Sequence, residues 1–270
     1  SLANIFADVM RFAQPSVRAA DQPAPIGGLP VGASHLGGLP DLPAGTEWPS
    51  YQGKPMSFVA QINLADAAPA DAAQLLPSAG MLWFFYDAAQ QTYGDDPDSR
   101  GGWQVITSVS GPAGLSRIDS PPDLPAGSRF QPTGLSFARE LTFPPAPQQA
   151  DPPPGWPADT AQRYENWLFD RFTPAERAQP HHRLLGWPDQ IQDDMQLQCA
   201  LVSRGFRSGD APGAAQAAQS RGDWLLLLQV DSDAAAGMHW GSAGRLYYWI
   251  EKAALAARQF DKTWLVMQSD

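Results

Sequence analysis

The stretch that decides the fold is 222-GDWLLLLQVDSDAAAGMHWGSAGRLYYWIEKAALAARQF-260. Its first part, residues 224–230, is the most apolar run in the chain and is typical of a buried strand. A loop of small residues follows, and then an aromatic run at residues 245–250 predicts a second strand. Because such a strand–loop–strand unit has an apolar face that it cannot bury alone, it must pack against another unit.

The first half of the chain carries a weaker version of the same arrangement. Three short matches occur in one order: HLGGLPD at 35–41 with HRLLGWPD at 182–189, FVAQIN at 58–63 with LLLQVD at 226–231, and SAGMLWFFY at 78–86 with SAGRLYYW at 242–249. They predict pseudo-repeats at about 29–110 and 181–268, joined by a proline-rich connector at 121–157. We therefore expect an α+β fold: one β-rich domain over residues 1–270, built from two duplicated strand–loop–strand units with a few short peripheral helices.

Other apolar runs predict the remaining elements. Alternating or continuous apolar residues indicate strands at 56–64, 81–87, 103–109, 195–203 and 263–268, and are compatible with another at 136–143. Helices are expected at 2–13, 65–76, 160–172 and 251–258. Residues 22–53 are rich in Gly and Pro but contain recurring hydrophobic residues, which predicts an ordered loop over the core rather than a disordered linker.

Charge and composition argue against several classes of protein. The 270 residues carry a formal net charge of −10, and Lys and Arg are scattered singly, so nucleic-acid phosphates would be repelled. No apolar stretch reaches the ~20 residues that span a bilayer. Cys199 is the single cysteine and cannot form an internal disulfide. We expect a cytoplasmic protein that binds neither nucleic acid nor membrane, with a protein partner as an open alternative.

Polar residues of the two pseudo-repeats form the candidate site. They would converge if the two units were related by a pseudo-twofold axis. Acid–base chemistry or ligand binding would need such groups to share a cleft. The structural alternative is that the glutamines satisfy buried backbone groups and the aspartates form turns. The ligand-binding candidates are His35, Asp41, Gln61, His182, Asp189, Gln229, Asp231 and Asp233.

Catalytic and metal-binding motifs are missing from the sequence. It contains no CxxC, HxH or HExxH pattern, no G-x-S-x-G elbow and no glycine-rich phosphate loop. The adjacent His181 and His182 would point apart on a regular element. The Asp231-x-Asp233 pair lacks the glycine and the glutamate that complete a calcium loop. We expect no metal and no cofactor, and the sequence assigns no catalytic residue.

Several passages together resemble the YwqG-like family, a bacterial family of unknown function. They are LGGLPDLP, the WP pair at 48–49, FVAQINL, LPSAGMLWFFYD, LLGWPDQIQDDM, WLLLLQVDSD and MHWGSAGRLYYWI. The resemblance covers about residues 29–268 and implies one α+β domain with a duplicated β-rich core, without an established activity, cofactor or catalytic residue. Relatives of that family occur near contact-dependent toxin systems, which implies a protective binding role. The family usually has an acid where this chain has Ser242.

Three functional hypotheses follow. The first is a non-enzymatic protein-binding module with a protective or regulatory role. The alternative is a small-molecule binder or an enzyme that uses a cleft between the two repeats. The third is a purely structural domain. Whether the protein is an enzyme stays open at this point.

Overall fold

The computed structural model describes residues 6–26, 28–145, 160–207 and 210–270. One ten-stranded sheet dominates it, with the order β14-β13-β12-β11-β1-β10-β2-β6-β7-β8. Every neighbouring pair is antiparallel. Its strands are β1 (Gln14–Gln22), β2 (His35–Leu36), β6 (Ser57–Asn63), β7 (Met81–Tyr86), β8 (Trp103–Ser108), β10 (Thr133–Thr142), β11 (His182–Leu184), β12 (Trp224–Asp231), β13 (Arg245–Glu251) and β14 (Trp264–Gln268).

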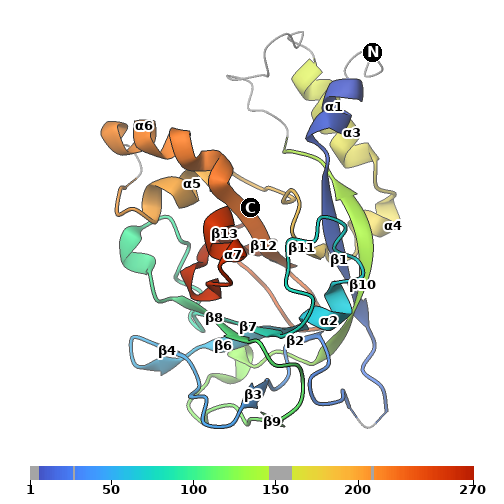
Figure 1. Ribbon diagram of the computed structural model, residues 1–270, viewed down its shortest axis with the longest axis vertical. Coiled ribbons are helices and arrows are strands. Elements are labelled where there is room, and N and C mark those ends of the chain that lie inside the picture. The colour runs from blue at the N-terminus through green and yellow to red at the C-terminus, as the bar shows by residue number, and fades with distance from the viewer. Residues whose placement is uncertain (1–5, 27, 146–159, 208–209) are drawn as a thin grey trace.

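The sheet curls around the long central pair of β1 and β10, which run side by side from Gln14 opposite Thr142 to Gln22 opposite Gly134. Figure 1 shows β6, β7 and β8 below, β11 to β13 above, and the central pair connecting them. The rings of Phe84 and Tyr248 meet edge to face across the interior, with centroids 5.0 Å apart. The two halves of this nearly closed sheet thereby bury their apolar faces against each other.

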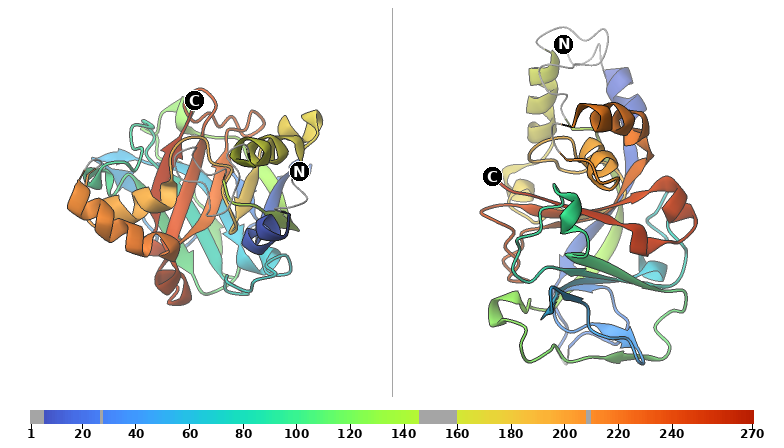
Figure 2. Two further views of the ribbon diagram at one scale, coloured as in Figure 1. Left: turned by 90° about the horizontal axis from the view of Figure 1, so that it is seen from above. Right: turned by 90° about the vertical axis from the view of Figure 1, so that its left-hand side faces the viewer.

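Helices and small hairpins surround the sheet. Two helices, α1 (Phe6–Phe12) and α3 (Thr160–Asp170), project from the top of the molecule in Figure 1, and α4 (Pro174–Arg177) lies below α3 beside the sheet. Figure 2 shows these helices from two further sides. The remaining helices are α2 (Leu64–Ala67), α5 (Met195–Val202), α6 (Ala211–Ser220) and α7 (Lys252–Ala256), with 3₁₀ turns at Pro97–Ser99, Ala126–Ser128, Arg221–Asp223 and Phe260–Lys262. Two small sheets pair β3 (Asp41–Pro43) with β9 (Leu115–Arg117) and β4 (Ser50–Tyr51) with β5 (Lys54–Pro55).

Strand β7 shows why one run of the sequence is wholly apolar. All six residues of MLWFFY are buried because both faces of the strand are covered. Leu82 and Phe84 belong to the main core between the two halves, whereas Trp83 and Phe85 belong to a smaller cluster with Leu42 of β3. Since successive side chains of a strand point to opposite faces, a strand between two cores needs apolar residues at every position.

The expectation of one β-rich domain with a few short peripheral helices is confirmed. The apolar runs at 56–64, 81–87, 103–109, 224–231, 245–250 and 263–268 are strands within one or two residues of the predicted bounds. The helix expected at 65–76 is limited to the single turn α2, and the first four residues of the helix expected at 2–13 lie outside the described residues. Within the described ranges, no helix has the length and apolar character needed to cross a bilayer.

Three expectations were wrong or incomplete. The run at 195–203, expected to be a strand, contains helix α5 (Met195–Val202). Asp194 caps this helix by accepting bonds from two backbone N–H groups, and its buried residues face the core. The sequence pattern does not predict strand β1, because its apolar residues do not alternate regularly. The proline-rich segment at 121–157 is more than a connector: β10 lies within it, in a stretch free of proline at the centre of the sheet.

Candidate functional site

Gln61 lies in the middle of β6 and is fully buried. Its Oε1 accepts the backbone N–H of Asp41 at 2.8 Å and the indole N–H of Trp83 at 2.8 Å. Its Nε2 donates to the carbonyl oxygen of Ala33 at 2.9 Å and to Oδ2 of Asp41 at 3.1 Å. The amide therefore satisfies both ends of the loop between Ala33 and Asp41, as a buried polar group must.

Gln229 has the same role in β12 and is also fully buried. Its Oε1 accepts the backbone N–H of Asp189 at 2.8 Å. Its Nε2 donates to the carbonyl oxygen of His181 at 2.6 Å and to Oδ2 of Asp189 at 3.1 Å. We call these two arrangements, Gln61 with Asp41 and Gln229 with Asp189, the two Gln–Asp clamps. Each clamp fixes a Pro-Asp turn against the middle of a core strand.

The surroundings of the two clamps correspond closely. Gln61 lies opposite Trp83 of the next strand, and Gln229 lies opposite Tyr247. The register of β6 shifts between Phe58 and Ala60, and the register of β12 shifts at the corresponding place, between Leu226 and Leu228.

One sequence match was out of register. The sheet places His35 opposite Gln61, and it places Arg183, rather than His182, opposite Gln229. The match between His35 and His182 is therefore wrong by one residue, because residues 182–189 form a segment one residue longer than residues 35–41. Counted from the strand pairing the two turns have equal length, since Asp41 follows His35 and Asp189 follows Arg183 by the same six residues.

Each clamp aspartate is also held by arginine. The Asp41 carboxylate receives Nε of Arg117 at 2.9 Å and the backbone N–H of Gly32 at 2.8 Å. Burial alone would raise the pKa of Asp41, but these donors and Gln61 together hold it below its ordinary value. The carboxylate is therefore ionised and fully occupied at neutral pH, which leaves it no free oxygen for a ligand.

Asp189 lies at the centre of a larger buried ionic cluster. Its carboxylate contacts Nη1 of Arg183 at 2.6 Å and Nη2 of Arg171 at 3.4 Å, while its carbonyl oxygen accepts from Tyr247 at 2.6 Å. Arg183 is wholly buried and also contacts Glu140 at 3.0 Å. Burial would raise the pKa of Asp189, but Arg183, His181 and Arg245 together outweigh it and lower that pKa far below its ordinary value. Such a cluster joins β10, β11 and the turn after β11 electrostatically.

His35 is buried and neutral. Its Nδ1–H donates to the carbonyl oxygen of Gly37 at 2.9 Å, and its ring meets Phe58 edge to face. Burial lowers the pKa of His35 more than its backbone bonds raise it. Within the described part of the chain, no hydrogen bond or ion pair joins His35 or Asp41 to His182 or Asp189, so the candidates lie in separate groups.

His182, Asp231 and Asp233 lie close together beside β1. The backbone N–H of Asp231 donates to Nδ1 of His182 at 3.1 Å. The Nε2 atom of His182 lies 3.8 Å from Oδ2 of Asp233 and 3.6 Å from Oδ1 of Asp21. Asp21 was missed by the sequence reasoning, because no local pattern signals that β1 pairs with β11. His181 and His182 do point apart, since His181 faces Asp189 instead.

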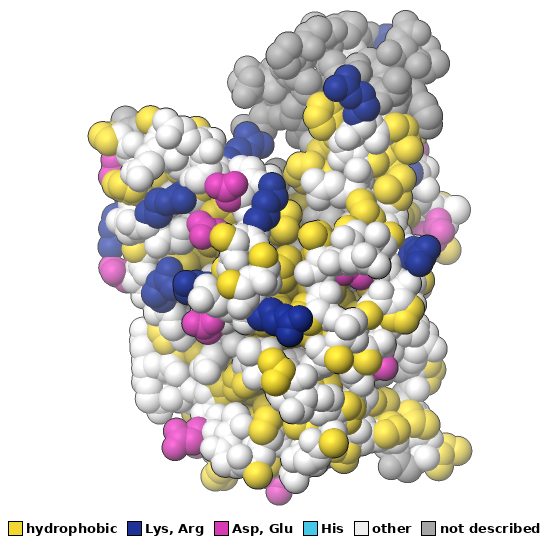
Figure 3. Space-filling model, viewed as in Figure 1, with side chains coloured by type: hydrophobic (Ala, Val, Ile, Leu, Met, Phe, Trp, Pro, Cys, Tyr) yellow, Lys and Arg dark blue, Asp and Glu magenta, His cyan; other side chains and the backbone are white. Residues whose placement is uncertain are grey.

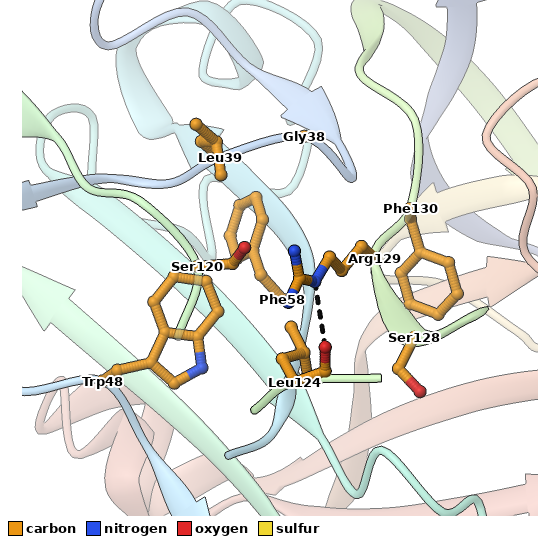
Figure 4. A pocket seen from close by; sticks show the side chains of 9 residues that line it. All are labelled: Gly38, Leu39, Trp48, Phe58, Ser120, Leu124, Ser128, Arg129 and Phe130. Carbon is orange, nitrogen blue, oxygen red and sulfur yellow. Dashed lines mark hydrogen bonds between the residues drawn. The ribbon is translucent and has the colours of Figure 1, made fainter. Parts of the chain in front are cut away.

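A cavity of about 160 Å³ lies on the side of the first half. Figure 4 shows the rings of Trp48, Phe58 and Phe130 around it, with Arg129 held by a bond from its Nε to the carbonyl oxygen of Leu124. The walls are mainly apolar, and none of the polar candidate residues lines it.

Comparison with known proteins gives the family but no activity. A search of curated proteins returned no match to this chain. The family model of a domain of unknown function (DUF1963) matches residues 34–269, which include both Gln–Asp clamps, the ionic cluster around Asp189 and most of the sheet. The chain therefore belongs to the family of the domain of unknown function DUF1963.

Proposed function

We propose that the protein is a non-enzymatic binding module that recognises a protein partner through the arm formed by α1, α3 and the adjoining ends of β1 and β10. The observation that supports this proposal is that the polar candidate residues bind groups inside the fold. Both clamp glutamines and both clamp aspartates form their hydrogen bonds with other groups of the protein itself. A catalytic or ligand-binding group has to keep an atom free for the substrate.

The arm, in contrast, presents large apolar side chains to solvent. Met10, Phe12, Leu141 and Phe169 are 39%, 49%, 46% and 61% exposed. Figure 3 shows hydrophobic side chains on the described part of this projection. Aromatic residues and methionine are enriched where proteins bind one another, and a patch of exposed apolar side chains marks an interaction surface.

The arm is also firmly built, as a binding surface should be. Under its exposed residues, Val9 and Tyr164 pack with Phe143 and Trp167, and the Tyr164 hydroxyl donates to the carbonyl oxygen of Pro144 at 2.7 Å. A rigid surface loses little conformational entropy on binding.

The experiment compares capture of partners by matched variants. The double variant Phe12→Ser, Phe169→Ser removes the two exposed aromatic side chains of the arm. Val109→Ser removes an apolar side chain that is still more exposed, 76%, just after the end of β8. We expect wild type and Val109→Ser to enrich the same protein from a lysate of the source cells at physiological salt, and the arm variant to lose it. If neither variant loses the captured protein, or if both variants lose it, the proposal is contradicted.

We also infer that the fold consists of two copies of one five-stranded unit, β1-β2-β6-β7-β8 and β10-β11-β12-β13-β14. The sheet order is symmetric about its centre. Because β1 pairs with β11 and β10 pairs with β2, the first strand of each copy pairs with the second strand of the other copy. The corresponding clamps and register shifts support this reading.

Fragments test the two-copy reading. Residues 1–120 and 121–270, cut in an exposed loop, should each be unfolded alone and should form a folded complex when mixed. Either fragment giving a cooperative unfolding transition by itself would argue against it.

A second role, binding of a small apolar molecule, is favoured by the cavity beside Trp48 and Phe130. The cavity volume of about 160 Å³ is close to the roughly 150 Å³ that holds benzene in an apolar cavity, and here the rings of Trp48, Phe58 and Phe130 supply the apolar walls. Indole and toluene should raise the unfolding temperature of wild type, and Phe58→Ala, which removes one apolar wall of the cavity, should weaken the effect. No shift with either compound would exclude this role for the cavity.

A further inference from the structure

Three side chains that are distant in sequence meet on one side of the central strands. Asp21 comes from β1, His182 from β11, and Asp233 from the loop that follows β12. Their facing atoms, Oδ1 of Asp21, Nε2 of His182 and Oδ2 of Asp233, all lie within 4.8 Å of one another. His182 and Asp233 are 1% and 2% exposed, and the Asp21 side chain is 27% exposed. We call this group the Asp–His–Asp cluster.

The three facing atoms have no hydrogen-bond partner although they are buried. The separations of 3.6 and 3.8 Å from His182 Nε2 are too long for hydrogen bonds. The other oxygen of Asp233 is occupied, because Oδ1 accepts the backbone N–H of Ala235 at 2.8 Å and so fixes the side chain with Oδ2 facing the cluster. Two buried carboxylate oxygens that face only the His182 Nε2–H, at 3.6 and 3.8 Å, are costly unless a cation neutralises them.

The geometry points to a site for one divalent metal ion of the zinc class. We propose that Asp21 Oδ1, His182 Nε2 and Asp233 Oδ2 bind it as three protein ligands. Zinc takes imidazole and carboxylate ligands at about 2.0–2.2 Å, and a tetrahedron with such bonds has edges of about 3.4 Å. The two edges that meet at His182 Nε2, 3.6 and 3.8 Å, exceed this value by a few tenths of an ångström, and the edge between the two carboxylate oxygens is at most 4.8 Å, so rotation of the Asp21 and Asp233 side chains closes the site around an ion.

Three protein ligands leave a fourth position for water or another small molecule. Sites with three protein ligands and an open position are typical of reactive zinc, whereas structural sites have four. The partial exposure of Asp21 gives an ion access from solvent. The imidazole favours zinc over magnesium or calcium, which prefer oxygen ligands alone.

Metal binding requires a change of tautomer in His182. In the metal-free protein Nδ1 accepts the Asp231 N–H, so the ring proton is on Nε2. In the metal-bound form this proton moves to Nδ1, and the Asp231 N–H has to turn away from it. The loss of one hydrogen bond lowers the affinity for the ion by roughly tenfold, so the site is weaker than a comparable site whose histidine is free at Nδ1.

The test is a calorimetric titration of chelator-treated, full-length protein with zinc sulfate. We expect one ion per chain for wild type and for His239→Gln, the control variant that removes an exposed histidine outside the cluster. Asp21→Asn, which keeps the size of the side chain, and His182→Gln should each weaken binding by more than about 100-fold, the upper limit for losing an outer-sphere partner. Circular dichroism should show that each variant is folded.

Two spectroscopic readouts separate this site from adventitious binding. Cobalt(II) should give the intense visible absorption of tetrahedral coordination in wild type but not in Asp21→Asn. The imidazole nitrogen-15 shifts of His182 should change from the Nε2–H tautomer to the Nδ1–H tautomer when zinc is added. Absence of one-to-one binding, or binding that is unchanged in Asp21→Asn and His182→Gln, would overturn the proposal.

Discussion

Replacing each clamp glutamine by methionine measures what the clamps contribute to stability. Methionine has nearly the same volume and leaves no cavity, so the change isolates the hydrogen bonds. In Gln229→Met, the Asp189 N–H and the His181 carbonyl lose their partners. A buried backbone group without a partner costs about 1–3 kcal/mol, and Asp189 is only half-buried, so we expect a loss of about 2–4 kcal/mol.

Gln61→Met should cost more, about 3–5 kcal/mol. Asp41 is fully buried, and the indole N–H of Trp83 becomes a third group without a partner. The free energy of unfolding is measured in urea, with Gln104→Met as the control because Gln104 is an exposed residue of β8. If both clamp variants fall within about 0.5 kcal/mol of wild type, or if Gln229→Met is the more destabilised, the structural role assigned to the clamps is refuted.

Other variants test further parts of the fold. Arg183→Met leaves the Asp189 carboxylate without its closest cation and should cost about 3–5 kcal/mol in urea. The pKa of Asp189 is lowered on folding, so its ionised form stabilises the protein above about pH 4, and that contribution is lost as pH falls further. Arg183→Met should therefore flatten the fall of the unfolding temperature between about pH 5 and 2. Gly94→Ala should cost more than about 2 kcal/mol, because φ is +76° and a Cβ would overlap the Leu265 carbonyl oxygen, whereas Gly111→Ala, with open space around it, should stay within about 0.5 kcal/mol.

Most strands could be predicted from the sequence because they are buried on one or both faces. A run such as MLWFFY in β7 has no polar position, and a run of this length is typical of a strand between two cores. The same reasoning failed for α5, where eight residues are too few to separate helical from strand periodicity, and the decisive signal was the cap at Asp194.

The candidate site depended more on long-range pairing than on local pattern. A glutamine in the middle of an apolar strand must find partners, but only the fold shows that Gln61 and Gln229 hold the turns at Asp41 and Asp189. The Asp–His–Asp cluster could not be predicted, because Asp21 reaches His182 only through the pairing of β1 with β11.

The central claim is that the exposed arm, rather than the buried polar groups, performs recognition. Its most direct test is to measure the affinity of three proteins for the captured partner. Wild type and Asp21→Asn should bind it equally in biolayer interferometry. The double variant Phe12→Ser, Phe169→Ser should bind at least about tenfold more weakly, since it loses two exposed aromatic side chains. Equal binding by the arm variant, together with loss of binding in Asp21→Asn, would contradict the claim.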